Sequence, residues 1–227
     1  MSDSSAAMES MRGDIIASIL DAVASHASTS SKVPPDEVKS RVLQEATRVG
    51  QHNAGRIVDT PSERWVMLCS LLLAAYRTLN AVTGDSAQAI AALMEATRRP
   101  FTRHIAAYLD DRFGISQDAP EEAFDRISET FKARGEERFG VTFTYVQAVQ
   151  DQDRSHVNVT RCFFNDFFAA NGAPEVTPIL CAMDAVWAEE TAHPRYGLHF
   201  ERPTTLAAGG DACRFQLLRL RRHGGDA

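Results

Sequence analysis

The stretch "VTFTYVQAVQ", residues 141–150, marks the point at which the hydrophobic period of the chain changes. Its side chains alternate between apolar and polar, and the alternation returns in "SHVNVTRC", residues 155–162. A period of two is typical of β-strands with one buried face. Because the polar tetrapeptide "DQDR" joins the two stretches, we predict an antiparallel hairpin.

The residues after this hairpin predict two helices followed by a second pair of strands. We place the helices at about 162–170 and 177–190, and the strands at about 195–207 and 211–221. The last strand loses its alternation after Leu217, which predicts either a bulge near Leu217-Leu218 or a sheet covered on both faces at that end. The order β-β-α-α-β-β indicates a four-stranded antiparallel sheet with helices on one face, an α+β fold.

The residues before 141 have helical periodicity instead. The segment "TPSERWVMLCSLLLAAYRTL", residues 60–79, is apolar almost all round and predicts a central buried helix with Thr60 as its N-cap. Residues 1–13 are small and polar, and we expect them to be frayed. The chain thus divides into a disordered N-terminus (1–13), a helical region (14–140) and an α+β region (141–221). No flexible linker is visible, so we expect the last two to form one compact unit.

The charge and composition of the chain indicate which kinds of partner it binds. The net charge is −6 and no lysine/arginine cluster follows a phosphate backbone, so we expect no nucleic-acid partner. The longest apolar run, residues 65–75, is too short to span a membrane, and the first residues lack the pattern of a secretory signal, so we expect neither a membrane span nor export. We therefore expect a cytoplasmic protein with reduced thiols that acts on a small molecule. The sequence leaves the oligomeric state open, a homo-oligomer included.

The segment "TPILCAMDAVWAEE", residues 177–190, holds the residues of greatest chemical interest. Cys181 and Asp184 are three positions apart and therefore neighbours on one face of the predicted helix, with Asp184 at the edge of its apolar arc. In one interpretation the pair lines a pocket, and the nearby helix N-terminus lowers the pKa of the Cys181 thiol. In the other, Cys181 is a small core residue and Asp184 is a solvated carboxylate.

Two further cysteines bear on the same question. Cys213 shares a strand face with Phe215 and should point to the core, whereas Cys162 ends a polar strand face that meets either solvent or a cavity. A zinc site would need these thiols and Cys181 with His193 or His199. The spacing contains no ligand pair, so we expect no metal and no cofactor.

The C-terminal half resembles the L-2-amino-thiazoline-4-carboxylate hydrolase family. The resemblance is carried by Cys162 before an aromatic helix, by the Cys181-x-x-Asp184 helix, and by the "GDACRF" strand, residues 210–215, in which one residue instead of two separates the aspartate from the cysteine. It covers about residues 141–220. It implies ring-opening hydrolysis of a small cyclic amidine or amide, which in the namesake reaction gives a carbamoyl amino acid.

These observations lead us to expect a hydrolase that cleaves a C–N or C–S ring bond. The catalytic candidates are Cys181, Asp184 and Cys213, and the substrate-binding candidates are Asn158, Cys162, His199, Glu201, Arg202 and Asp211. Either a cysteine thiolate attacks the ring carbon, or Asp184 activates water and the cysteines only shape the pocket. The alternative is a non-catalytic small-molecule sensor with a cysteine-lined cavity. An enzyme requires an ionisable pair within hydrogen-bond reach inside that cavity, whereas a sensor does not.

Overall fold

The computed structural model describes residues 3–30 and 33–220. The helices of the first part are α1 (Asp3–Ser30), α2 (Pro35–His52), α3 (Thr60–Thr83), α4 (Ser86–Arg103), α5 (Ile105–Phe113) and α6 (Ala123–Phe139). The strands are β1 (Thr144–Gln150), β2 (Arg154–Arg161), β3 (Leu198–Glu201) and β4 (Cys213–Arg219), with helices α7 (Phe163–Ala170) and α8 (Thr177–Thr191) between β2 and β3. The predicted α+β class and the change from helices to strands after residue 140 are confirmed.

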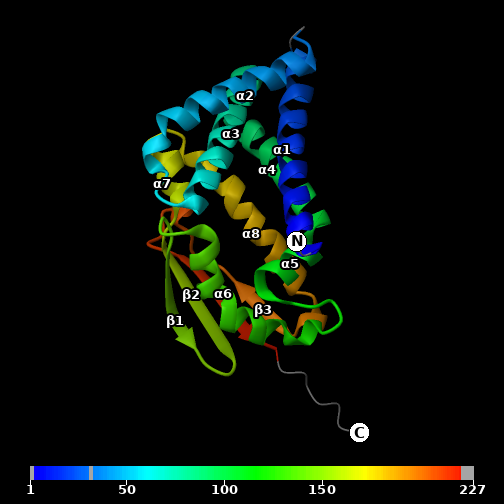
Figure 1. Ribbon diagram of the computed structural model, residues 1–227, viewed down its shortest axis with the longest axis vertical. Helices are drawn as coiled ribbons and strands as arrows, with labels where there is room; N and C mark the ends of the chain where they lie inside the picture. Colours follow the sequence, from blue (N-terminus) through cyan, green and yellow to red (C-terminus); the bar gives the residue numbers. More distant parts are fainter. Residues whose placement is uncertain (1–2, 31–32, 221–227) are drawn as a thin grey trace.

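The four strands form one antiparallel sheet in the order β1-β2-β4-β3. Val157 of β2 lies opposite Phe215 of β4, and Val159 lies opposite Cys213. All four side chains are buried, because strands alternate and these positions share the inner face. In Figure 1 helix α6 lies across the sheet, helices α1 to α4 form the upper part of the molecule, and α8 runs between the two parts.

The last two strands are shorter than the sequence predicts. Strand β3 holds only Leu198–Glu201, because short 3₁₀ turns precede it at Pro194–Tyr196 and follow it at Leu206–Ala208. Strand β4 ends at Arg219, and residue 221 lies outside the described residues. Of the two alternatives for the lost alternation, the bulge near Leu217-Leu218 is wrong, since the described β2–β4 and β3–β4 pairs keep an unbroken register. Arg219 instead keeps the inner-face position, where it pairs with Asp125 and stacks over Phe124 of α6.

Helix α3 is the central helix of the bundle, as predicted. Leu72 and Leu73 are fully buried, and α3 packs against α2, α1 and α4. By length and apolar composition it is also a candidate membrane span, but 56% of that stretch is buried inside the protein, which accounts for the composition. The N-cap is Asp59 and not Thr60, because the Asp59 carboxylate accepts the Ser62 backbone N–H at 2.7 Å.

The expectation of a frayed N-terminus through residue 13 is wrong. Helix α1 begins at Asp3, and Met8 and Met11 are buried in the same core as Ile15 and Ile19. The polar composition of residues 1–13 conceals these two methionines, which lie three and four positions from the next apolar residues of the stripe. Their burial against the bundle stabilises a helical start that local propensity alone does not predict.

Asp59 also joins the bundle to the beginning of the sheet region. Its second carboxylate oxygen accepts the backbone N–H of Val141 at 2.9 Å, immediately after Gly140 ends helix α6. Gly140 has a φ of +78°, a region that glycine adopts without strain. A Cβ atom at this position would also overlap the Asp59 carboxylate. The junction therefore requires glycine on two grounds.

We expect Gly140→Ala to destabilise the protein by about 1–3 kcal/mol, through backbone strain and the clash with Asp59. The matched control is Gly13→Ala in helix α1, where an added Cβ meets no heavy atom within 4 Å. The control should be neutral or stabilising by about 0.5–1 kcal/mol, since alanine is the better helix former. Urea denaturation followed by circular dichroism measures both, and equal midpoints for the two variants would contradict the prediction.

Candidate functional site

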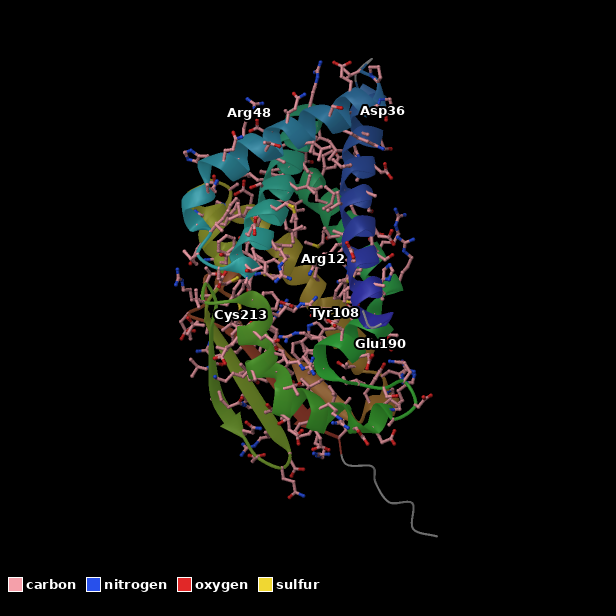
Figure 2. All side chains as sticks on the ribbon, viewed as in Figure 1. Arg12, Asp36, Arg48, Tyr108, Glu190 and Cys213 are labelled. Carbon is pink, nitrogen blue, oxygen red and sulfur yellow. The ribbon has the colours of Figure 1, made fainter. Side chains whose placement is uncertain are left out.

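A cavity of about 210 Å³ lies where the helical bundle meets the inner face of the sheet. Its wall is largely apolar and aromatic, with contributions from both halves of the chain. The residues that line it are Met11, Arg12, Ile15, Ile16, Arg64, Trp65, Met67, Leu68, Leu71, Phe101, Tyr108, Arg112, Phe113, Phe131, Arg138, Phe139, Phe143, Tyr145, Val159, Cys162, Phe164, Leu180, Cys181, Met183, Asp184, Trp187, Cys213 and Phe215. In Figure 2 the labelled Arg12, Tyr108 and Cys213 lie around the middle of the molecule, where bundle and sheet meet.

Three thiols and one carboxylate predicted from the sequence come together on this cavity. Cys181 and Asp184 project from one face of α8, Cys162 stands at the N-cap of α7, and Cys213 is the first residue of β4. Cys213 is buried on the inner sheet face, as its position in the strand predicted. The expected common pocket of Cys181, Asp184 and Cys213 is confirmed. The catalytic roles assigned to these three residues stay predictions.

Asp184 is the acidic group of the cavity wall. Arg202 Nη1 donates to Asp184 Oδ2 at 3.0 Å, and the side chain of Trp187 also hydrogen-bonds to the carboxylate. Burial raises the pKa of Asp184, and the nearby Arg202 and Arg112 oppose that rise only in part. The side chain keeps 37% of its surface exposed and lines the cavity, so a small molecule can reach a carboxylate that bulk water solvates poorly.

Arg202, one of the substrate-binding candidates, is engaged with Asp184, so its guanidinium is not free for a substrate carboxylate. Its guanidinium bonds Asp184, donates to the Cys181 backbone carbonyl at 3.1 Å, and lies 5.6 Å from the centre of the Phe215 ring. Only 16% of its side chain is exposed. Arg202 therefore holds the Asp184 carboxylate in one orientation.

The thiols do not have the lowered pKa that the helix position of Cys181 predicted. Burial, together with the charge of Asp184, raises the pKa of Cys181 to about 12, and the opposing effect of Arg202 is smaller. Burial also raises the pKa of Cys162 and of Cys213. At neutral pH a thiol with a pKa near 12 is ionised in only about one molecule in 10⁵. The helix dipole is therefore a minor contribution beside desolvation and the neighbouring carboxylate.

Four predicted binding residues lie away from the cavity. Asn158 is on the outer face of β2, opposite Arg214, because Val157 and Val159 hold the inner positions. His199 and Glu201 project outward from β3 and pair with each other at 3.0 Å. Asp211 is exposed in the turn before β4 and pairs with Arg214. Of the predicted binding residues, Cys162 lines the cavity.

Four arginines that sequence reasoning missed line the same cavity. They are Arg12, Arg64, Arg112 and Arg138. Burial is the largest cause that lowers the pKa of Arg12, and the charges of Arg64 and Arg138 lower it further. These guanidinium groups are therefore close to one another. A sequence signal existed for Arg112. It is four positions after Tyr108 and next to Phe113 in "YLDDRF", residues 108–113, which places an arginine on the apolar face of a helix.

Among residues 3–30 and 33–220, no group of three or more His, Cys, Asp or Glu side chains could hold a metal ion. The described thiols and Asp184 thus do not form a ligand set of the kind that zinc requires.

The model of the family described as L-2-amino-thiazoline-4-carboxylic acid hydrolase matches residues 66–217. The matched range includes the three thiols, Asp184, Arg202 and Arg112, whereas Arg12 and Arg64 lie before it. The comparisons with curated proteins and with solved structures found no match.

Proposed function

Because the chain belongs to the L-2-amino-thiazoline-4-carboxylic acid hydrolase family, we propose that it opens the ring of a small cyclic amidine or amide by hydrolysis of a C–N or C–S bond. The observation that carries this proposal is Asp184 on the cavity wall, whose carboxylate accepts a 3.0 Å hydrogen bond from Arg202 behind it. A binding protein needs no such pair, whereas a hydrolase needs a base that is both oriented and accessible. The pair therefore favours an enzyme over a sensor.

The chemistry assigned to Asp184 is general base and then general acid. Asp184 accepts a proton from a water molecule as the water oxygen bonds to the ring carbon, which becomes tetrahedral. When the bond from that carbon to the ring nitrogen or sulfur breaks, Asp184 returns the proton to the departing atom. One water is consumed and Asp184 ends as the carboxylate. Its raised pKa suits both steps, because a base of low pKa accepts protons poorly.

The cysteines, in this proposal, form part of the wall. A thiolate mechanism would need a lowered pKa at Cys181, and the pKa is raised instead, to about 12. The Asp184 carboxylate is oriented by Arg202 and not by the Cys181 thiol. Water activated by Asp184 is therefore the better account of the attacking group.

We expect Cys181→Ser to keep turnover within about ten-fold of the native enzyme, because serine preserves the size of the wall residue and no step passes through sulfur. Steady-state kinetics and intact-protein mass spectrometry on a trapped reaction mixture check this. A covalent substrate adduct on Cys181, together with loss of nearly all turnover in Cys181→Ser, would show that the thiol is the nucleophile.

The test of the proposed function is a panel of cyclic amidines, hydantoins and lactams, with 2-amino-thiazoline-4-carboxylate among them. Ring opening at a C–S bond releases a thiol, which a thiol-specific chromogenic reagent detects. Opening at a C–N bond gives a linear product that liquid chromatography separates. We expect turnover of at least one ring by the native protein, and a strongly reduced turnover of the same ring by Asp184→Asn. A folded native protein that opens no ring in the panel would count against the hydrolase and in favour of the sensor.

A further inference from the structure

Arg112 of α5 is a buried cation without a counter-charge of its own. Its exposed fraction is 4%, and its guanidinium carbon lies 5.2 Å from the Phe113 ring centre and 5.8 Å from that of Phe131. Its Nη1 atom is buried and has no hydrogen-bond partner among the described residues. Within the same residues, no carboxylate oxygen lies within 4.0 Å of this guanidinium. Aromatic faces offset only part of the cost of burying a charge.

The rest of the cavity wall does not supply the missing anion. Arg12 and Arg64 likewise have no carboxylate within 4.0 Å in the described part of the chain, and only Arg138 is paired, with Asp111 at 2.8 Å. Asp184 is the acidic side chain among the lining residues, and it is already bonded to Arg202. The cavity therefore has an excess of positive charge, with Arg12 exposed and Arg112 buried. An anionic ligand would compensate this excess.

The other side chains of the cavity wall indicate the chemistry of the uncharged part of the ligand. Next to Arg112 it consists of aromatic rings that also contact one another: Phe113, Phe131 and Trp187 have ring centres 5.4 to 6.0 Å apart. Surfaces of this kind bind flat apolar groups through area burial and offset ring contacts. A small, fully polar acid would leave these surfaces unfilled.

We propose that Arg112 binds the carboxylate of the substrate, and that the substrate is a carboxylic acid carried on an apolar, ring-bearing body. The inference rests on the proposed function, because it names the class of molecule that would reach Asp184. Arg112 is in this view a specificity-determining residue, which fixes the ring beside the base, while Arg12 and Arg64 attract the acid to the cavity. Arg202 does not take this role, since its guanidinium already bonds Asp184.

The test uses binding of inert probes, so it does not depend on turnover. Both tryptophans of the chain, Trp65 and Trp187, line the cavity, and their fluorescence reports a bound ligand. The probes are 3-phenylpropionate, its uncharged amide 3-phenylpropionamide, and propionate, which has the carboxylate without the ring. We expect the native protein to bind 3-phenylpropionate at least about ten-fold more tightly than either of the other two.

Variants test whether Arg112 causes the preference for the acid over the amide. Arg112→Gln should abolish the preference for acid over amide while the amide binds as before, and Arg112→Lys should restore part of the preference. The control is Arg41→Gln, which removes the same charge from the exposed Arg41–Glu37 pair on α2 and should change nothing. Circular dichroism establishes that each variant is folded. If Arg112→Gln does not fold, the acid-to-amide ratio of the native protein and of Arg112→Lys decides the matter.

Failure of 3-phenylpropionate to bind, or equal binding of acid and amide by the native protein, would overturn the proposal. So would an Arg112→Gln variant that keeps the native ratio. These results are distinguishable from failure of the proposed function. Acid-selective binding without any ring opening would support the anion site and reject the hydrolase. Ring opening of uncharged substrates without acid selectivity would support the hydrolase and reject the anion site.

Discussion

Replacing Asp184 by asparagine is expected to lower kcat by about 10²- to 10⁴-fold, the range associated with loss of a general acid–base group. Asparagine keeps the size of the side chain and an oxygen that can accept from Arg202, but it cannot take a proton from water. The affinity for substrate should change much less, because the proposed contacts to the ligand come from Arg112 and the aromatic wall. Steady-state kinetics on the best substrate of the panel separate kcat from KM.

The same variant should also change the dependence on pH. In the native enzyme kcat/KM should fall as the pH drops through the pKa of Asp184, which burial raises above its ordinary value of 3.8. The base is active only when deprotonated, so activity is retained on the alkaline side of that pKa. The residual activity of Asp184→Asn should lack this acid limb.

The control for this experiment is Asp211→Asn. Asp211 is also paired with an arginine, at 2.9 Å, but it is exposed and lies outside the cavity. It should retain native kcat and the native pH profile. Asp184→Asn with kcat within a few-fold of native would remove Asp184 from the mechanism.

The second large effect concerns stability. Leu72→Ala in α3 is expected to reduce the free energy of unfolding by about 2–5 kcal/mol, because the substitution loses buried apolar surface and leaves a cavity at a fully buried position. Leu43→Ala in α2 is the control. Leu43 is 46% exposed, so the same chemical change should cost much less there. Urea denaturation of both variants makes the comparison, and a similar loss at the two positions would contradict a central role for α3.

Much of the fold follows from local pattern. The change from a helical period to alternation after residue 140 marks the true boundary between α6 and β1, and the "DQDR" turn joins β1 to β2 as predicted. The spacing of Cys181 and Asp184 places both on one face of α8, because neighbours on a helix are three or four residues apart. These features depend on the backbone geometry of a single segment, so the order of residues specifies them directly.

The chemistry of the site depends on contacts between distant segments. Arg202 is 18 residues from Asp184 along the chain, yet it is the group that holds the carboxylate. The raised pKa of Cys181 comes from desolvation and from Asp184, so it reverses a prediction based on helix position alone. Arg112 lines the cavity only because α5 packs against both α6 and α8.

Tertiary packing also determines which side chains face the cavity and which face outward. His199 and Glu201 face outward because Leu198 and Phe200 take the inner positions of β3, a strand shortened by two 3₁₀ turns. Asn158 faces outward because its neighbours Val157 and Val159 take the inner positions of β2. Met8 and Met11 extend helix α1 because the bundle buries them. Periodicity tells which residues share a face, but burial, pairing and charge are properties of what packs against that face, and only the tertiary structure supplies them.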